Sequence, residues 1–168
     1  MKIGCVLLAA GAGRRFGGGK LLSRVEGEPM MERALRLYAS APFAARVCVT
    51  RAEEEEIAAL AKEHGFDVLI NPDPDRGVGT SVSVGTLGVL SQEPALDGVL
   101  YAVSDQPFLT QESVLRLIAA FHREPRRIVS LAFGQKRGNP AVFPMQMFGE
   151  LEALCEDVGG GAVIRRHP

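Results

Sequence analysis

Residues 3–20 of the chain read IGCVLLAAGAGRRFGGGK. The apolar run from Ile3 to Leu8 is typical of a buried β-strand, and a glycine-rich turn follows where that strand ends. Such a turn lets backbone N–H groups come within hydrogen-bonding distance of a phosphate. Arg14, Arg15 and Lys20 add positive charge to the same loop. The stretch therefore predicts a first strand that carries a nucleotide-binding loop at its carboxyl end.

The two common phosphate-binding loops do not match this stretch. A dinucleotide fingerprint that starts at Gly11 needs glycine at the position of Phe16. A P-loop that ends in Gly19 and Lys20 needs its first glycine where Arg14 stands. A surface loop with solvated charges is the simpler alternative, but the position directly after a buried strand favours a phosphate site of another type.

The composition is that of an ordinary globular domain. The chain has 168 residues, of which 46% are hydrophobic and 23% charged, which suits one domain with a good core. A net charge of −1 provides no field that would gather nucleic acid or an anionic membrane surface. No stretch reaches the apolar length of a membrane span, and the amino terminus does not resemble a secretory signal. We expect a cytoplasmic protein with no nucleic-acid or membrane partner.

The three cysteines lack the C-x-x-C spacing of zinc and redox sites. Cys5 and Cys48 fall inside predicted strands, where a reduced thiol packs as a small hydrophobe. We therefore expect neither a disulfide framework nor a zinc site.

Strand and helix signals alternate along the chain. Strands are expected at residues 3–9, 46–50, 67–70, 99–103 and 128–133. Helices are expected from Pro29, from the glutamates at 53–56 to Gly65, after Thr110 and near 145–154. The glutamate run suits the solvated first turn of a helix better than a metal site. The alternation predicts a single-domain, three-layer α/β/α fold with a mostly parallel, Rossmann-like sheet.

The stretch 80–90 allows two interpretations. The alternation of Val82 and Val84 with polar residues resembles a strand, and Gly85 and Gly88 are poor helix residues. Parallel neighbouring strands, however, need a crossover between the third and fourth strands. We expect a helix here.

Three unusual sequences follow predicted strands, and ligands bind outside the carboxyl ends of the strands in such a sheet. They are the glycine-rich loop, the segment 77–81 and the sequence Ser-Asp-Gln-Pro at 104–107. A carboxylate such as Asp105 at a strand end can hold Mg²⁺ while phosphates fill the other coordination positions. The alternative is a turn residue that satisfies its own backbone, but a neighbouring phosphate loop favours the metal role.

Further motifs follow in order along the chain: Asn71-Pro72, Gly77 before Ser81-Val82, Gly138-Asn139-Pro140, and Asp157 with Gly159. Together with the loop and Asp105 they resemble the MobA-like nucleotidyltransferases, and most of all the molybdenum cofactor cytidylyltransferases (MocA type). The loop alone is shared with sugar-nucleotide and methylerythritol-phosphate cytidylyltransferases, and the later segments narrow the resemblance. Because the motifs cover nearly the whole chain, the resemblance implies one MobA-like NTP transferase domain over residues 1–168.

The resemblance implies transfer of CMP from CTP to the terminal phosphate of molybdopterin, with Mg²⁺ and release of pyrophosphate. In-line attack on the α-phosphorus is catalysed mainly by positioning and electrostatic stabilisation. The resemblance also implies a molybdenum hydroxylase as the recipient of the finished cofactor.

Residue roles follow from the resemblance. Lys20 and Arg15 would neutralise the transferring phosphoryl group and the departing pyrophosphate, and Asp105 would hold the metal. Asn139 and Asp157 would face the acceptor. The nucleotide-binding residues would be Leu8, Ala9, Ala10, Gly11, Ala12, Gly13, Asn71, Thr80 and Ser81.

Ala10 bears on the choice of nucleotide. Family members that use GTP usually carry a second glycine at this position, whereas CTP users carry alanine. The methyl group narrows the room for a purine, so we expect CTP.

The chain departs from the family pattern at three places. Glu156 stands where the family usually has glycine, and Gly161 where it often has arginine. Relatives also carry a second metal-binding aspartate in a further strand, and no aspartate follows Asp157 here. Three interpretations follow: the metal site has one protein carboxylate, another residue substitutes for the second, or the activity is weak.

Two other functions are compatible with these residues. One is a cytidylyl- or uridylyltransferase for a sugar or polyol phosphate. The other is a non-catalytic nucleotide- or cofactor-binding protein that assists assembly of molybdenum hydroxylases. The missing second aspartate favours the binding protein, whereas Arg15, Lys20 and Asp105 favour an enzyme, because a pure binder does not need transition-state charge.

Overall fold

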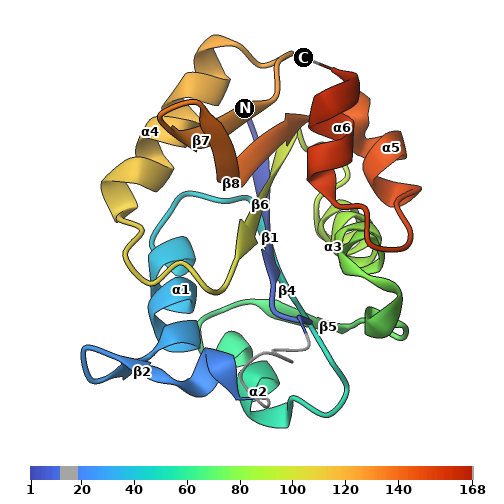
Figure 1. Cartoon of the computed structure of the whole chain (residues 1–168). Coiled ribbons are helices and arrows are strands. Elements are labelled where there is room, and N and C mark those ends of the chain that lie inside the picture. Colours follow the sequence, from blue (N-terminus) through green and yellow to red (C-terminus); the bar gives the residue numbers. More distant parts are fainter. Residues whose placement is uncertain (12–18, 168) are drawn as a thin grey trace.

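A six-stranded sheet forms the middle layer of the computed structural model, which describes residues 1–11 and 19–167 (Figure 1). Its strands are β1 (Ile3–Leu8), β4 (Ala45–Thr50), β5 (Asp67–Ile70), β6 (Gly98–Val103), β7 (Val129–Phe133) and β8 (Lys136–Pro144). They lie in the order β5-β4-β1-β6-β8-β7. The first four in this order are mutually parallel, whereas β8 runs antiparallel to both of its neighbours.

Helices cover both faces of the sheet, and each face has its own apolar core. One face carries α1 (Met30–Ala39), α2 (Glu55–Glu63) and α4 (Gln111–Arg123). The other carries α3 (Val78–Gln92), α5 (Phe148–Glu152) and α6 (Gly160–Arg166). Short 3-10 turns span Lys20–Leu22, Pro74–Arg76 and Met145–Met147. The expected three-layer α/β/α fold with a mostly parallel sheet is confirmed.

The stretch 80–90 is helical, within α3, as the crossover argument predicts. Other elements differ from the sequence-based expectation. The helix expected near 145–154 is a 3-10 turn followed by the short α5. Three elements were not expected: β8, α6, and a small hairpin of β2 (Arg24–Val25) and β3 (Glu28–Pro29).

The chain changes its direction of travel across the sheet at β1. It passes through α1 to β4 and through α2 to β5 on one side, and α3 then returns it to β6 on the other side of β1. In open α/β sheets the crevice outside the carboxyl ends of the strands at such a switch point is where ligands bind. We therefore expect a ligand-binding site at the segments that follow β1 and β6.

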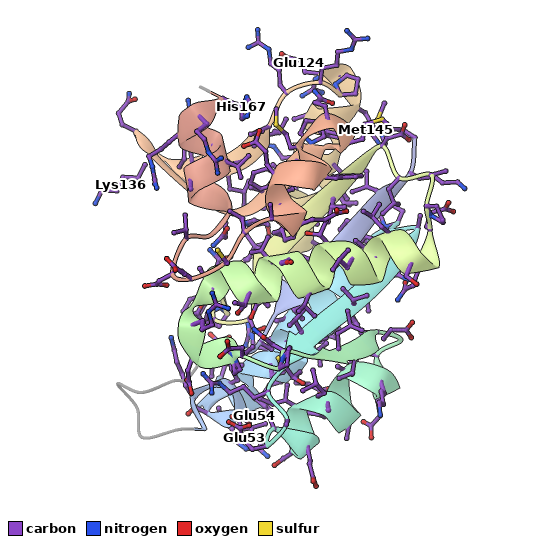
Figure 2. The ribbon with its side chains drawn as sticks, turned by 90° about the vertical axis from the view of Figure 1, so that its right-hand side faces the viewer. Glu53, Glu54, Glu124, Lys136, Met145 and His167 are labelled. Atoms are coloured by element: carbon purple, nitrogen blue, oxygen red, sulfur yellow. The ribbon has the colours of Figure 1, made fainter. Side chains whose placement is uncertain are left out.

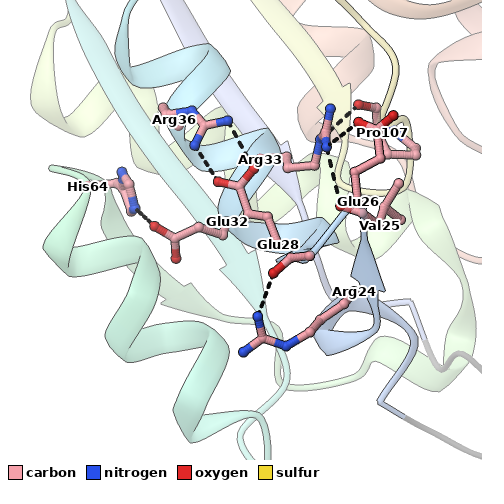
Figure 3. Close-up of polar contacts among 10 residues, drawn as sticks. Arg24, Val25, Glu26, Glu28, Glu32, Arg33, Arg36, His64 and Pro107 are labelled. Atoms are coloured by element: carbon pink, nitrogen blue, oxygen red, sulfur yellow. Dashed lines mark hydrogen bonds and ion pairs between the residues drawn. The ribbon is translucent and has the colours of Figure 1, made fainter.

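The hairpin and α1 brace the segment that follows β6 (Figure 3). Arg33 on α1 donates from Nε to the carbonyl of Pro107 at 3.1 Å and from Nη1 to that of Val25 at 3.3 Å. The same guanidinium pairs with Glu26 of the hairpin at 3.0 Å. Because Pro107 lies just beyond Asp105, these contacts help to fix the backbone that carries the carboxylate.

Candidate active site

The main chain where β1 ends is held by hydrogen bonds from both neighbouring strands. The N–H of Ala9 donates to the main chain of β4 at 2.8 Å, and the Leu8 carbonyl accepts from the Ser104 hydroxyl at 2.9 Å. The Ala10 carbonyl accepts from Nε of Arg51 at 2.8 Å. The described start of the glycine-rich loop is therefore fixed in position before any ligand arrives.

Lys20 and Asp105 form an ion pair in the wall of a cavity at the carboxyl ends of β1 and β6. The Lys20 Nζ lies 2.7 Å from Oδ2 of Asp105, although the two residues are 85 positions apart in the chain. Both line a cavity of about 220 Å³, together with Leu8, Ala9, Gly11, Gly19, Leu21, Glu54, Ile57, Val78, Val103 and Ser104. The structure thus brings together the predicted catalytic lysine, the predicted metal carboxylate and the described part of the loop.

This ion pair is exposed enough to exchange partners. The Lys20 side chain is 31% exposed and the Asp105 side chain 42%. Ion pairs at this level of exposure contribute about 0–1 kcal/mol to stability. Either group can therefore turn to a phosphate or a cation at little cost in folding free energy.

A second cavity of about 330 Å³ adjoins the first, and the two share Leu8, Gly11 and Val78 in their walls. Its other wall residues are Ala10, Arg51, Pro74, Asp75, Arg76, Gly77, Ser81 and Asp157. This cavity contains the predicted nucleotide-binding residues Ala10 and Ser81, so these lie next to the cavity that Lys20 and Asp105 line.

Asn71 lies behind this cavity and is almost fully buried. Its amide donates to the hydroxyls of Thr80 and Ser81, each at 2.8 Å, and its Oδ1 accepts from the N–H of Asp73 at 2.9 Å. Thr80 in turn donates to the carbonyl of Gly77 at 2.8 Å. Asn71 and Thr80 thus form a network that orients Ser81 at the start of α3.

Asp157 reaches the second cavity from the loop between α5 and α6. The N–H of Gly79 donates to the Glu156 carbonyl at 3.0 Å, which ties this loop to the start of α3. Glu156 has φ +64°, so the position where the family pattern has glycine adopts a left-handed backbone here.

Asn139 lies on β8, beside the segment that carries Asp105. Its carbonyl accepts from Nε2 of Gln106 at 3.0 Å, and its side chain is exposed. The two predicted acceptor residues thus contact different elements: Asn139 is held near Asp105, and Asp157 near the start of α3. Three other predicted residues, Ala12, Gly13 and Arg15, lie outside the described residues.

Sequence reasoning missed Arg51, because a single arginine after a strand matches no motif. Its guanidinium donates to Ala10 and also contacts Asp75 at 2.9 Å. Its side chain is only 10% exposed. An arginine placed directly after an apolar strand was the one available signal.

The glutamate run behaves as a helix start. Figure 2 shows Glu53 and Glu54 at the opposite end of the molecule from Glu124 and His167. Glu55 and Glu56 form the first turn of α2, as the helix dipole favours.

Within residues 1–11 and 19–167, no three His, Cys, Asp or Glu side chains gather as a metal centre. Nor does any helix of that part of the chain have the length and apolarity to cross a bilayer.

Comparison with known proteins agrees with this geometry. Residues 5–168 match the family described as MobA-like NTP transferase domain. The chain is 32% identical to nicotine blue oxidoreductase of Paenarthrobacter nicotinovorans over 168 residues, covering 95% of this chain and 78% of the relative. It is 26% identical to a probable molybdenum cofactor guanylyltransferase of Thermococcus kodakarensis over 152 residues, covering 90% of this chain and 63% of the relative.

Among solved structures, Rv0371c of Mycobacterium tuberculosis matches with a TM-score of 0.84 and 24% identity, covering 100% of this chain and 85% of that one. The structure of the same protein in complex with manganese matches with a TM-score of 0.82. These likenesses show a shared fold. With the family match over nearly its whole length, the chain belongs to the MobA-like NTP transferase domain family.

Proposed function

We propose that the chain is a Mg²⁺-dependent nucleotidyltransferase that moves CMP from CTP to the terminal phosphate of a molybdopterin-type acceptor. The observation that carries the proposal is the Lys20–Asp105 pair, 2.7 Å apart at a cavity walled by the end of β1. An ammonium and a carboxylate at the switch point of an α/β sheet are the groups that a metal–triphosphate complex requires.

In this reaction an oxygen of the acceptor phosphate bonds to the α-phosphorus of CTP. The bond from that phosphorus to the oxygen bridging to the β-phosphate breaks, and pyrophosphate leaves with the electron pair. Lys20 then donates hydrogen bonds to the phosphate oxygens on which negative charge grows, a form of stabilisation typically worth about a hundredfold in rate or more. Arg15, outside the described residues, is proposed to share this role.

Asp105 is suited to hold the metal. Mg²⁺ binds oxygen ligands and commonly uses one or two carboxylates, with phosphates and waters in the remaining positions. The Asp105 carboxylate is partly exposed beside the cavity and already attracts a cation, Lys20. When bound, the metal would neutralise phosphate charge and orient the triphosphate. The manganese in the complex of the related mycobacterial protein supports a divalent cation in this fold.

The lining of the second cavity favours a pyrimidine base over the larger purine. Ala10 and Ser81 both line it, and the Ser81 hydroxyl accepts from Asn71, which leaves the hydroxyl hydrogen to donate to a base. A methyl group at Ala10 narrows the room for a purine in this cavity, so we propose CTP. The archaeal relative is named a guanylyltransferase, which makes GTP the competing nucleotide.

The acceptor is proposed to lie toward Asn139 and Asp157. A molybdopterin-type acceptor rests on the resemblance and on the name of the archaeal relative. A molybdenum hydroxylase as the recipient of the product rests on the resemblance alone.

The test measures pyrophosphate release with CTP or GTP, Mg²⁺ and molybdopterin, in parallel with sugar and polyol phosphates. Pyrophosphate is diagnostic, because an oxidoreductase like the named relative does not form it. We expect release with CTP and molybdopterin, and a loss of about a hundredfold or more in Lys20→Met and Asp105→Asn. Lys2→Met is the matched control, because it removes a second lysine–carboxylate pair at 2.7 Å, that of Lys2 with Glu93, from outside the cavities described above.

The outcomes separate the candidate functions. Turnover only with a sugar or polyol phosphate would favour that class of transferase. Nucleotide binding without turnover on any acceptor would favour the assembly factor. Equal rates in the wild type and Asp105→Asn would show that the carboxylate does not hold the catalytic metal.

A further inference from the structure

Arg51 joins three segments at the carboxyl edge of the sheet. It directly follows β4, and its side chain is 10% exposed. Nε donates to the carbonyl of Ala10 at 2.8 Å, and Nη2 contacts Oδ1 of Asp75 at 2.9 Å. Nη1 lies 3.5 Å from Oε1 of Glu53. A guanidinium has donors in a rigid plane, so it fixes the relative positions of the groups that it contacts.

Two of the residues that Arg51 contacts, Ala10 and Asp75, line the same cavity. Ala10 belongs to the start of the glycine-rich loop, and Asp75 to the 3-10 turn before α3. Both line the second cavity, as does Arg51 itself, and the remaining charged and polar side chains of the lining are those of Arg76, Ser81 and Asp157. The Arg51 guanidinium thus connects the main chain of Ala10 to the side chain of Asp75 within the lining of this cavity.

We infer that Arg51 is a positioning residue that sets the width of the base pocket and thereby favours a pyrimidine over a purine. This inference rests on the proposed function, because it takes the second cavity as the place of the base. In the proposed reaction Arg51 acts through its contacts with Ala10 and Asp75, and the phosphates are assigned to the adjoining cavity that Lys20 and Asp105 line.

Arg46 provides a comparison on the same strand. It lies near the amino end of β4, and its Nη2 donates to the carbonyl of Ala41 at 2.9 Å and approaches that of Ala39 at 3.5 Å. It therefore also uses a guanidinium to hold main-chain carbonyls, but it lines neither of the two cavities. A purely structural role for Arg51 would make the two arginines equivalent in their effect on nucleotide choice.

The experiment compares Arg51→Met, Arg51→Lys and Asp75→Ala with Arg46→Met. Dissociation constants for CTP and GTP are measured with Mg²⁺ by calorimetry, kcat and KM by pyrophosphate release, and stability by thermal unfolding. In Arg51→Met we expect KM for CTP to rise about tenfold with kcat changed by no more than about twofold. The CTP over GTP preference in kcat/KM should fall about fivefold or more.

Arg51→Lys and Asp75→Ala should shift the preference in the same direction by a smaller factor, and they carry the test where Arg51→Met does not fold. Arg46→Met should lose stability and keep the wild-type preference. An unchanged preference in the Arg51 variants, with CTP binding retained, overturns the inference alone. An equal fall in Arg46→Met overturns it as well. Absence of CTP and GTP binding in the wild type overturns the proposed function together with the inference.

Discussion

Gly77, at the start of α3, packs against the loop that carries Asp157. Its replacement by alanine tests how tightly the helix start and the loop are packed. A Cβ atom at Gly77 would lie 2.4 Å from both N and Cα of Asp157 and 2.5 Å from the carbonyl carbon of Glu156. These are backbone atoms, which cannot rotate away, so the loop would have to move by about 1 Å to reach ordinary contact distance. The backbone at Gly77 also has φ 126° and ψ 175°, a region that is almost exclusive to glycine.

The two costs add in Gly77→Ala. The backbone strain amounts to about 1–3 kcal/mol. The forced displacement adds about 1–3 kcal/mol, as in other overpacked sites. We expect the free energy of unfolding to fall by about 2–6 kcal/mol in urea denaturation. Nucleotide affinity should fall as well, because Gly77 and Asp157 line the second cavity.

Gly65→Ala is the matched control. Gly65 has φ +78°, yet a Cβ there would meet no atom within 4 Å, so this variant isolates the backbone strain at about 1 kcal/mol. The reasoning is refuted if both variants lose the same stability, or if Gly77→Ala binds CTP as tightly as the wild type. The first result would mean that the loop yields freely, and the second that its position does not matter to the ligand.

Two further substitutions, at Glu156 and Cys48, test the cost of a positive φ and the effect of burial on a thiol. Glu156→Gly should raise the free energy of unfolding by about 0.5–1 kcal/mol in urea, because φ +64° is costly for any residue with a Cβ, and a loss of stability would contradict this. Burial raises the pKa of the Cys48 thiol to about 12 and that of Cys5 beyond the usual range, so the folded protein keeps protons that the unfolded chain releases. The contribution of these thiols to the free energy of unfolding should therefore be fully present below about pH 8.5. Toward pH 12 the free energy of unfolding should fall by up to about 1.4 kcal/mol per pH unit for each thiol. Urea titrations between pH 7 and 10.5 should show a shallower fall in Cys48→Ala, and an unchanged slope would contradict the assignment.

The sequence predicted the helix at α3 only through topology. Its local pattern was misleading because Gly85 and Gly88 are chosen by contacts across layers. A Cβ at Gly85 would lie 2.3 Å from Cγ1 of Val6, and one at Gly88 would lie 2.1 Å from Cδ1 of Leu69. Glycine lets the helix pack closely on β1 and β5, an advantage that helix propensity does not register.

Strand β8 escaped prediction for a related reason. Its sequence is polar at the start and contains Pro140 and Pro144, which argue against a strand inside a sheet. The pairing with β7 passes from Ser130 opposite Ala141 to Leu131 opposite Gly138, so Asn139 and Pro140 form a bulge. The bulge accommodates the proline, which has no N–H to donate, and only the partner strand reveals it.

At the site, strand ends could be read from the sequence, but contacts between loops could not. The positions of Lys20 and Asp105 follow from the rule that parallel strands present their carboxyl ends at one edge. The same rule placed Asn71 at that edge, yet its amide is used by Thr80 and Ser81. Residue type and strand position alone do not distinguish a group that touches a ligand from one that orients it.

Arg51 and Asn71 together explain how the second cavity is built. Arg51 connects the main chain of Ala10 to Asp75 of the 3-10 turn, and Asn71 holds the hydroxyl of Ser81. Both are buried polar groups whose hydrogen bonds are made within the protein, which costs little when the partners are satisfied and much when one is removed. The cavity is therefore held in shape by contacts within the protein. Under the proposed function, discrimination between bases then depends on the distance that these contacts set between its walls, since a larger ring fits only where the contacts give way.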